Sequence, residues 1–350
     1  MYNMIDQQYY IITIFVIVAI SFLSTSLINL EKNRIYGFSL YIILLLLVVF
    51  RPCSMSDYEN YKNSFLVSYD IRFEPIFGAV KYVVKQFENP AFWGIATFAF
   101  LSVSIRLLFV YKCSSSLFAS LLVYISNVYI AQDMIAIRAA LATAFLLPSL
   151  YYKANGDKYK FIIFLLLAVL SHYSACLFFI LLFVSSQKAY ANYYFILLLI
   201  SFILTFFGVT FGQYLSMIGI MQIQSAAEIY MNQKGINIFN LLQIGRIIVC
   251  CFCWFIHREY TNKGENIDGF ATLLLKVYTL GLCFAFLFSD LISISVRSSE
   301  LFFSVEILMV PYYFSKGFRN PIIYKTILLT YASIILYISI HDIAYWPNLK

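Results

Sequence analysis

Charge is scarce in this sequence, and that scarcity decides the class of protein. Asp, Glu, Lys and Arg make up 12% of the 350 residues, against about 25% in an ordinary soluble domain. Hydrophobic residues make up 62%, and the mean hydropathy is +0.82. These values exclude a soluble globule and predict a polytopic helical membrane protein. The apolar runs are continuous rather than alternating, which disfavours a transmembrane barrel.

Signals for several other functions are missing as well. The net charge of +7 is spread over short loops without a basic patch, so we expect no nucleic-acid partner. The sequence contains no nucleotide-binding loop, dinucleotide fingerprint, nucleophile elbow or zinc-protease motif. We therefore expect no cofactor, and any reaction should take its energy from an activated substrate.

The seven cysteines form no extracellular disulfide framework. Cys250, Cys251 and Cys253 share one apolar run, without a partner histidine or a second cysteine pair. We interpret them as packing residues and expect no metal site.

The hydropathy pattern predicts one all-α integral-membrane domain over residues 1–350, with about twelve transmembrane helices. The run from Tyr9 to Leu30 suits a span, and no basic segment of a cleavable signal peptide precedes it. Two short helices are expected to meet at His172, because a single span through that point would invert every later loop. The predicted spans are residues 9–30, 35–51, 91–111, 117–131, 133–153, 159–171, 173–186, 191–208, 237–257, 269–289, 298–315 and 322–342.

Lys and Arg set the orientation of these spans. Twelve of the 24 lie in alternate loops, eight lie in the opposite loops and termini, and four lie inside spans. Five of the eight belong to one long loop, residues 51–90, and the positive-inside rule counts only short loops. The set of twelve is therefore placed in the cytoplasm, and both termini are placed outside.

Two outward loops are long, residues 51–90 and 209–236, and each is expected to contain an amphipathic helix lying in the membrane interface. In the first loop, Lys81 and Lys85 lie away from the apolar face. That predicted face consists of Ile76, Phe77, Val80, Val83, Val84 and Phe87.

When the predicted spans are placed across a membrane, six side chains that could take part in chemistry lie on its outer side. Charges near hydrocarbon are costly, so their gathering on one side suggests a site. Three arginines among them suggest an anionic group such as phosphate or pyrophosphate. The six are Arg51, Asp57, Glu74, Arg138, His172 and Arg297.

Each of these residues also has a plainer interpretation. Arg138, about five residues into its helix, could pair with Asp133 or another acid, or snorkel outward, instead of binding substrate. His172 could cap a helix, or it could accept a proton or donate to a phosphate oxygen. Asp57 could simply be solvated, and Glu74 could serve as the acidic residue at a helix start.

Other charges near the spans are assigned by their depth. Glu300 lies one turn after Arg297 on the same helix face, and we expect it to support that arginine. Glu306 is expected to pair with Arg246 at similar depth. Arg106 and Lys276 lie near cytoplasmic helix ends and are interpreted as snorkelling. (Tyr61, four residues after Asp57, is a further supporting residue.)

At these residues the chain resembles the Wzy-type polysaccharide polymerases, in the branch called EpsG-like. The resemblance rests on an ordered set of weak motifs that spans most of the chain, with Ser-Met-Ser before Asp57 where the family often has glycine. The motifs are FRPCSMSDYENYKNSF, RFEPIFGAVKYVV, QDMIAIRAALATAF, LAVLSHYSACLF and VRSSELFFSVEILMVP.

The resemblance implies a glycosyltransferase of the bacterial cytoplasmic (inner) membrane with a GT-C-like architecture. Such enzymes make O-antigen or similar lipopolysaccharide chains from oligosaccharides on undecaprenyl diphosphate, at the periplasmic face. Arg138, Arg297 and Arg51 would bind the diphosphate, and His172, Asp57 or Glu74 would accept the proton of the attacking hydroxyl. Membrane lipids and a chain-length regulator are the other expected partners. A flippase for the same lipid-linked units and an O-antigen ligase are the alternatives.

Overall fold

The computed structural model describes residues 4–24, 34–51, 55, 57–66, 74–187, 191–211, 240–265 and 267–341. Helices dominate these residues, and no strand occurs among them, as an all-α membrane protein requires. The interfacial helix expected within 209–236 lies outside the described residues, apart from residues 209–211.

Several helices are apolar enough to belong in a membrane. Within the described ranges, five are long enough to cross it: Pro90–Cys113, Leu117–Ile135, Leu241–Asn262, Gly269–Leu287 and Pro321–His341. Shorter apolar helices accompany them, including Gly37–Val49 and Ala191–Phe206. The chain is therefore a helical membrane protein, while the total of twelve spans and the GT-C-like architecture stay predictions.

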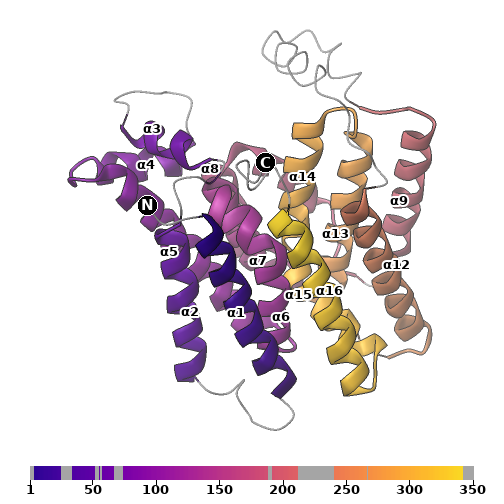
Figure 1. Cartoon of the computed structure of the whole chain (residues 1–350). Coiled ribbons are helices and arrows are strands. Elements are labelled where there is room, and N and C mark those ends of the chain that lie inside the picture. The colour runs from indigo at the N-terminus through magenta and orange to yellow at the C-terminus, as the bar shows by residue number, and fades with distance from the viewer. Residues whose placement is uncertain are drawn as a thin grey trace. The chain divides into compact units, whose positions relative to one another are not determined.

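The chain divides into two compact units (Figure 1). Unit 1 comprises Met1–Cys176 and Val310–Lys350, and unit 2 comprises Leu177–Met309. The helices of unit 1 are α1 (Met4–Ser24), α2 (Arg34–Val49), α3 (Tyr58–Leu66), α4 (Pro75–Val84), α5 (Pro90–Cys113), α6 (Leu117–Val123), the π-helix η2 (Tyr124–Ile135), α7 (Ile137–Ala154), α8 (Lys158–Ser171) and α16 (Pro321–His341).

Polar helix ends gather at one end of unit 1. The short helices α3 and α4 lie at the end where α2 finishes and α5 begins (Figure 1). The first turn of α1 and the last turn of α16 lie toward the same end (Figure 1). The described residues of 51–90 therefore lie at one end of unit 1. The ion pairs of Glu74 with Arg138 and His172 bring the junctions before α7 and after α8 to the same region.

The junctions themselves follow from local breaks. Ala136, with φ −97° and ψ 65°, is the one residue between the π-helix and α7. His172 is extended, with φ −158° and ψ 120°, and it separates α8 from the 3₁₀-helix η3 (Tyr173–Leu182). The prediction that two helices meet at His172 is therefore confirmed, although the second one is a 3₁₀-helix.

Aromatic packing fixes α3 on α5. The Phe65 ring stacks on Phe77 of α4 with centroids 4.6 Å apart, and Phe77 in turn lies 5.7 Å from Phe98 of α5. Gly94 of α5 makes room for this layer, because a methyl group there would meet Phe65 ring carbons at 2.5 and 2.7 Å.

The apolar face predicted for α4 is partly wrong. Phe77, Lys81 and Val84 form the buried face, while Tyr82 and Val83 are exposed. Packing against α5 and α8 selects the face that carries Phe77, and this face includes the lysine that hydropathy assigned to water. The exposed Tyr82 and Val83 still suit a helix in a membrane interface.

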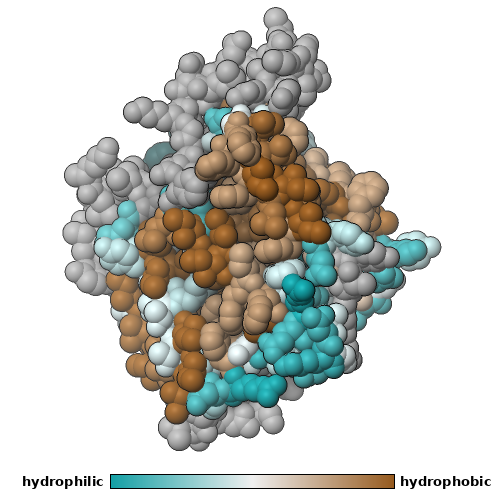
Figure 2. Space-filling view, turned by 90° about the vertical axis from the view of Figure 1, so that its right-hand side faces the viewer, coloured by the Kyte–Doolittle hydropathy of each residue, from teal (hydrophilic) through white to brown (hydrophobic). Residues whose placement is uncertain are grey.

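Unit 2 contains α9 (Ala191–Phe206), α12 (Leu241–Asn262), α13 (Gly269–Leu287) and α14 (Ile292–Phe303), and it includes the start of α15 (Glu306–Gly317). Large apolar side chains of α9 and α12 are exposed, among them Ile203, Phe206 and Ile248. Figure 2 views the molecule from the right-hand side of Figure 1. It shows hydrophobic residues over much of this face and hydrophilic residues toward its lower edge. Such a surface is suited to lipid.

The span predicted at 298–315 is not one helix. α14 ends at Phe303 and α15 begins at Glu306. The Ser304 hydroxyl donates to the Leu301 carbonyl at 2.8 Å, and a side chain that bonds back to its own helix in this way tends to bend it. Cys250 and Cys253 of α12 are buried, as packing residues should be, whereas Cys251 is only partly buried.

We predict that Gly94→Ala displaces α3 from α5. The added methyl group overlaps the Phe65 ring, and overpacking of this kind costs about 1–3 kcal/mol. The melting temperature of the purified protein should fall by several degrees, as read by intrinsic fluorescence. Gly78→Ala is the matched control, because no heavy atom lies within 4 Å of its added methyl group. Equal melting temperatures for the two variants would contradict this packing.

Candidate functional site

A single carboxylate joins two of the predicted site residues. Glu74 Oε2 accepts from Arg138 Nη1 at 2.7 Å, and Glu74 Oε1 lies 2.8 Å from His172 Nδ1. The Glu74 side chain is 4% exposed, against 26% for Arg138 and 18% for His172. The carboxylate is thus buried beneath two partners that reach solvent.

Local structure explains how these three side chains meet. Glu74 occupies the N-cap of α4 but makes no side-chain cap hydrogen bond, so its carboxylate is turned away from its own helix. Arg138 is the second residue of α7. His172 follows the last residue of α8. Glu74 therefore stands at a helix start, as its plainer interpretation has it, but its carboxylate binds Arg138 and His172 and does not cap the helix.

Aromatic side chains form a wall beside Arg138. Its Cζ lies 5.5 Å from the Tyr61 ring centroid and 5.7 Å from that of Phe77. Tyr61 is 5% exposed. Burial raises the pKa of the Tyr61 phenol, and the Arg138 charge only partly offsets this. Tyr61 is therefore neutral at ordinary pH and can donate a hydrogen bond.

The electrostatics of Glu74 favour its ionised form. Burial raises the pKa of Glu74, but the hydrogen bond from His172 and the charge of Arg138 outweigh it and lower the pKa to about 2. An ionised carboxylate only accepts hydrogen bonds, so His172 Nδ1 carries the proton between them. In the neutral imidazole, Nε2 is then the nitrogen with the free lone pair.

Arg51 presents one edge of its guanidinium to the π-helix. Nη1 donates to the carbonyls of Met134 at 2.7 Å and Asp133 at 3.3 Å, and Cζ lies 5.8 Å from the Tyr58 ring. Arg51 is 4% exposed, and within the described part of the chain Nε and Nη2 have no hydrogen-bond partner. These two atoms form the side-on fork that matches a carboxylate or a phosphate.

Asp57 lies beside these groups without an ion pair in the described residues. It accepts from Asn60 Nδ2 at 3.5 Å, and its charge acts on both Arg51 and Tyr61. Unit 1 therefore brings together five of the six predicted residues, Arg51, Asp57, Glu74, Arg138 and His172, with the supporting Tyr61.

Arg297 and Glu300 belong to unit 2. Arg297 is exposed on α14. Glu300 Oε1 instead binds Arg246 Nη2 of α12 at 2.8 Å, so its predicted support of Arg297 is wrong. The pair predicted between Arg246 and Glu306 is also replaced by this one, although the charge of Glu306 still acts on Arg246. The break between α14 and α15 changes the relative register of the two glutamates.

Sequence reasoning misread two further cations. Arg106 does not snorkel: it is fully buried, and its Nε lies 3.4 Å from Asp133 Oδ2. Asp133, one partner considered for Arg138, is thus bound to another arginine, and Arg138 pairs with a different acid, Glu74. Lys276 is buried as well, and its Nζ donates to the carbonyls of Ser185 and Gln187 at 2.7 Å each. One sequence feature could have indicated a special role for Asp133: it lies just before a helix break, in the segment QDMIAIR.

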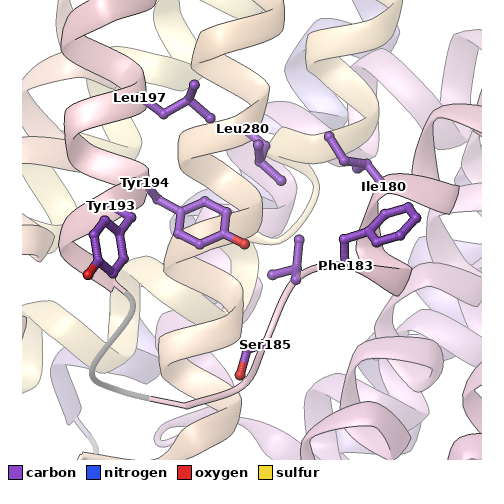
Figure 3. A pocket seen from close by; sticks show the side chains of 8 residues that line it. Ile180, Phe183, Ser185, Tyr193, Tyr194, Leu197 and Leu280 are labelled. Carbon is purple, nitrogen blue, oxygen red and sulfur yellow. The ribbon is translucent and has the colours of Figure 1, made fainter.

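Unit 2 holds an open pocket of about 560 Å³ (Figure 3). Leu197, Leu280, Ile180 and Phe183 supply apolar walls, and the Tyr194 ring points toward them. Polar lining is confined to Ser185 and the tyrosine hydroxyls. A pocket of this composition suits hydrocarbon better than a diphosphate.

Comparison with known proteins gives one match. The family model described as EpsG family matches residues 34–349, and this range includes all the predicted site residues. No curated protein and no solved structure matches the chain.

We predict that the low pKa of Glu74 makes stability depend on pH at the acid end. Its pKa lies near 2 in the folded protein, below the ordinary value of 4.5. The ionised carboxylate therefore stabilises the fold above pH 4.5, and this contribution is lost as the pH falls toward 2. The melting temperature of wild type should exceed that of Glu74→Gln at pH 6, and the gap should narrow between pH 4.5 and pH 2.5. A constant gap over that range would contradict the ionised bridge.

Proposed function

Because the chain belongs to the EpsG family, we propose that it is a polysaccharide polymerase of the bacterial cytoplasmic membrane. It transfers a growing glycan from undecaprenyl diphosphate to a lipid-linked repeat unit at the periplasmic face, where both termini also lie. The observation that carries this proposal is the Glu74 bridge, which places a guanidinium and an imidazole on one buried carboxylate. An anion site and a proton acceptor thereby lie next to each other.

The reaction needs no external energy source. The oxygen of a hydroxyl group on the acceptor unit attacks the anomeric carbon of the glycan, and a new glycosidic bond forms. The bond between that carbon and the phosphate oxygen breaks, and undecaprenyl diphosphate departs with the bonding electrons. The hydroxyl proton passes to a base. The protein therefore has to stabilise charge on the leaving group and accept one proton.

Arg51 and Arg138 are the proposed ligands of the diphosphate. The Nε–Nη2 edge of Arg51 is the bidentate fork that phosphate oxygens fit. Arg138 stands in the first turn of α7, where backbone N–H groups and the helix dipole also favour an anion. For Arg297 of unit 2, a role as a diphosphate ligand stays a prediction from the sequence, which places it on the same face of the membrane.

His172 is the proposed base. Glu74, with a pKa near 2, is a weak proton acceptor and acts instead by fixing the ring and the tautomer of His172. A carboxylate that orients a histidine in this way is the arrangement used by catalytic triads. Asp57 is the second candidate base, since it lies near Arg51 without an ion pair in the described residues. Membrane lipids and a chain-length regulator are the proposed partners.

We predict that Arg138→Ala abolishes long-chain polysaccharide while the protein stays in the membrane. Removing the guanidinium removes a group that stabilises the departing diphosphate, and such losses typically reduce rates by about 100–1,000-fold. Single lipid-linked units should accumulate, as resolved by gel electrophoresis of extracted glycans. Arg319→Ala is the control, because Arg319 is an exposed arginine of a loop predicted to be cytoplasmic. Normal chain lengths in Arg138→Ala would refute the role given to this residue.

A deletion strain separates the proposal from its alternatives. The polymerase predicts single units on the outer face of the membrane. Units retained on the inner face would indicate a flippase, and intact long chains on undecaprenyl diphosphate with none on lipid A would indicate a ligase.

A further inference from the structure

A buried ion pair adjoins the candidate site in unit 1. Arg106 of α5 and Asp133 of the π-helix are both 0% exposed, with Nε and Oδ2 3.4 Å apart. Asp133 also accepts from the Ser102 hydroxyl at 2.7 Å and the Tyr124 hydroxyl at 2.8 Å. Burying such a pair is expensive, and apolar residues often stabilise a core as well or better. Stability alone therefore gives little reason for this pair.

Arg106 connects three segments of unit 1. Its Nη2 donates to the Ala140 carbonyl at 2.9 Å and lies 3.0 Å from Thr143 Oγ1, both in α7. The same nitrogen lies 3.3 Å from Gln132 Oε1 in the π-helix. Ala140 is two residues after Arg138 on α7. One guanidinium thus sets the first turns of α7 relative to α5 and the π-helix.

The π-helix carries the same constraint to Arg51. The carbonyls that hold Arg51 Nη1 belong to Asp133 and Met134, and the Asp133 side chain is the one fixed by Arg106. π-helical turns are rare and are frequently found at functional sites. The π-helix directs two successive carbonyls at one edge of the Arg51 guanidinium. It thereby sets the direction in which the opposite edge of Arg51, the Nε–Nη2 fork, points.

We propose that Arg106 and Asp133 are positioning residues that set Arg51 and the first turn of α7 for a diphosphate. This inference rests on the proposed function, since it takes the diphosphate as the ligand of the site. Neither residue touches the substrate. They act through the Asp133 and Met134 carbonyls on one side and through Ala140 and Thr143 on the other.

The test replaces the pair by apolar residues of similar size, Arg106→Met with Asp133→Leu. Such replacements tend to preserve folding, so the melting temperature should stay at or above that of wild type. Affinity for inorganic pyrophosphate, measured by calorimetry on the full chain in nanodiscs, should fall by about 100-fold, the effect of roughly 2.8 kcal/mol, because Arg51 and the first turn of α7 are no longer held in place. The exposed pair of Lys263 and Glu259, changed to Gln at both positions, is the control and should bind as wild type does.

A coupling measurement separates positioning from a structural role. In an Arg51→Gln background, the apolar double variant should lose part of its effect on pyrophosphate affinity, because it acts in part through Arg51. A purely structural role predicts the same loss of affinity in both backgrounds, and that result would overturn the proposal. Wild-type affinity in a folded double variant would overturn it as well.

Thr143→Val decides the case in which the double variant does not fold. This change keeps the side-chain volume and removes the oxygen near Arg106. It should weaken pyrophosphate binding by about tenfold, the effect of roughly 1.4 kcal/mol. The melting temperature should fall by only a few degrees, since the buried hydroxyl also donates to Gln132 Oε1. Unchanged affinity would overturn the proposal. If wild type itself does not bind pyrophosphate and Arg51→Gln makes normal polymer, the proposed function fails and not merely the positioning role.

Discussion

The buried Glu74 carboxylate is the constraint on which the site geometry depends. A carboxylate that is 4% exposed needs partners for both oxygens, and here each oxygen takes one. Arg138 comes from the start of α7 and His172 from the end of α8, so one side chain at the start of α4 fixes the ends of two helices. Loss of this carboxylate would leave Arg138 without its buried counter-charge and His172 without the group that selects its tautomer.

This constraint also explains why the site lies at helix ends. In hydrocarbon, a backbone group left without a partner is costly, so irregular backbone is tolerated only where it is buried in protein or lines a cavity. Ala136 and His172 are such irregular points, and each adjoins or belongs to the site. Arg51 uses the end of the π-helix in the same way, because its Nη1 satisfies the carbonyls of Asp133 and Met134. Catalytic-type side chains and unsatisfied backbone groups thus occur together.

Sequence patterns predicted the site better than its support. Loop order and alternating sidedness were enough to group Arg51, Glu74, Arg138 and His172, because residues that flank spans on one side must share one face of the membrane. Position along a helix did not predict the environment of Arg106. It placed this residue near water, whereas the side chain is buried against Asp133. That pairing depends on a π-helix, and hydropathy carries no signal for an extra residue per turn. Glu300 replaced Glu306 as the partner of Arg246 for a similar reason, since the predicted span of residues 298–315 ran through the break at Ser304.

Charge balance argues for a division of roles among the cations. In unit 1, the two arginines of the site face Glu74 and the nearby Asp57, so the described cluster is close to neutral before any substrate binds. Arg138 already shares its charge with Glu74 at 2.7 Å, whereas the Arg51 fork has no partner in the described part of the chain. A departing diphosphate therefore needs positive charge that appears during the reaction or comes from elsewhere. In the proposed reaction, proton transfer to His172 would supply it, because the imidazolium would form next to Glu74 as negative charge develops on the leaving group. On this argument the carboxylate that makes His172 a base also stabilises the cation which that base becomes.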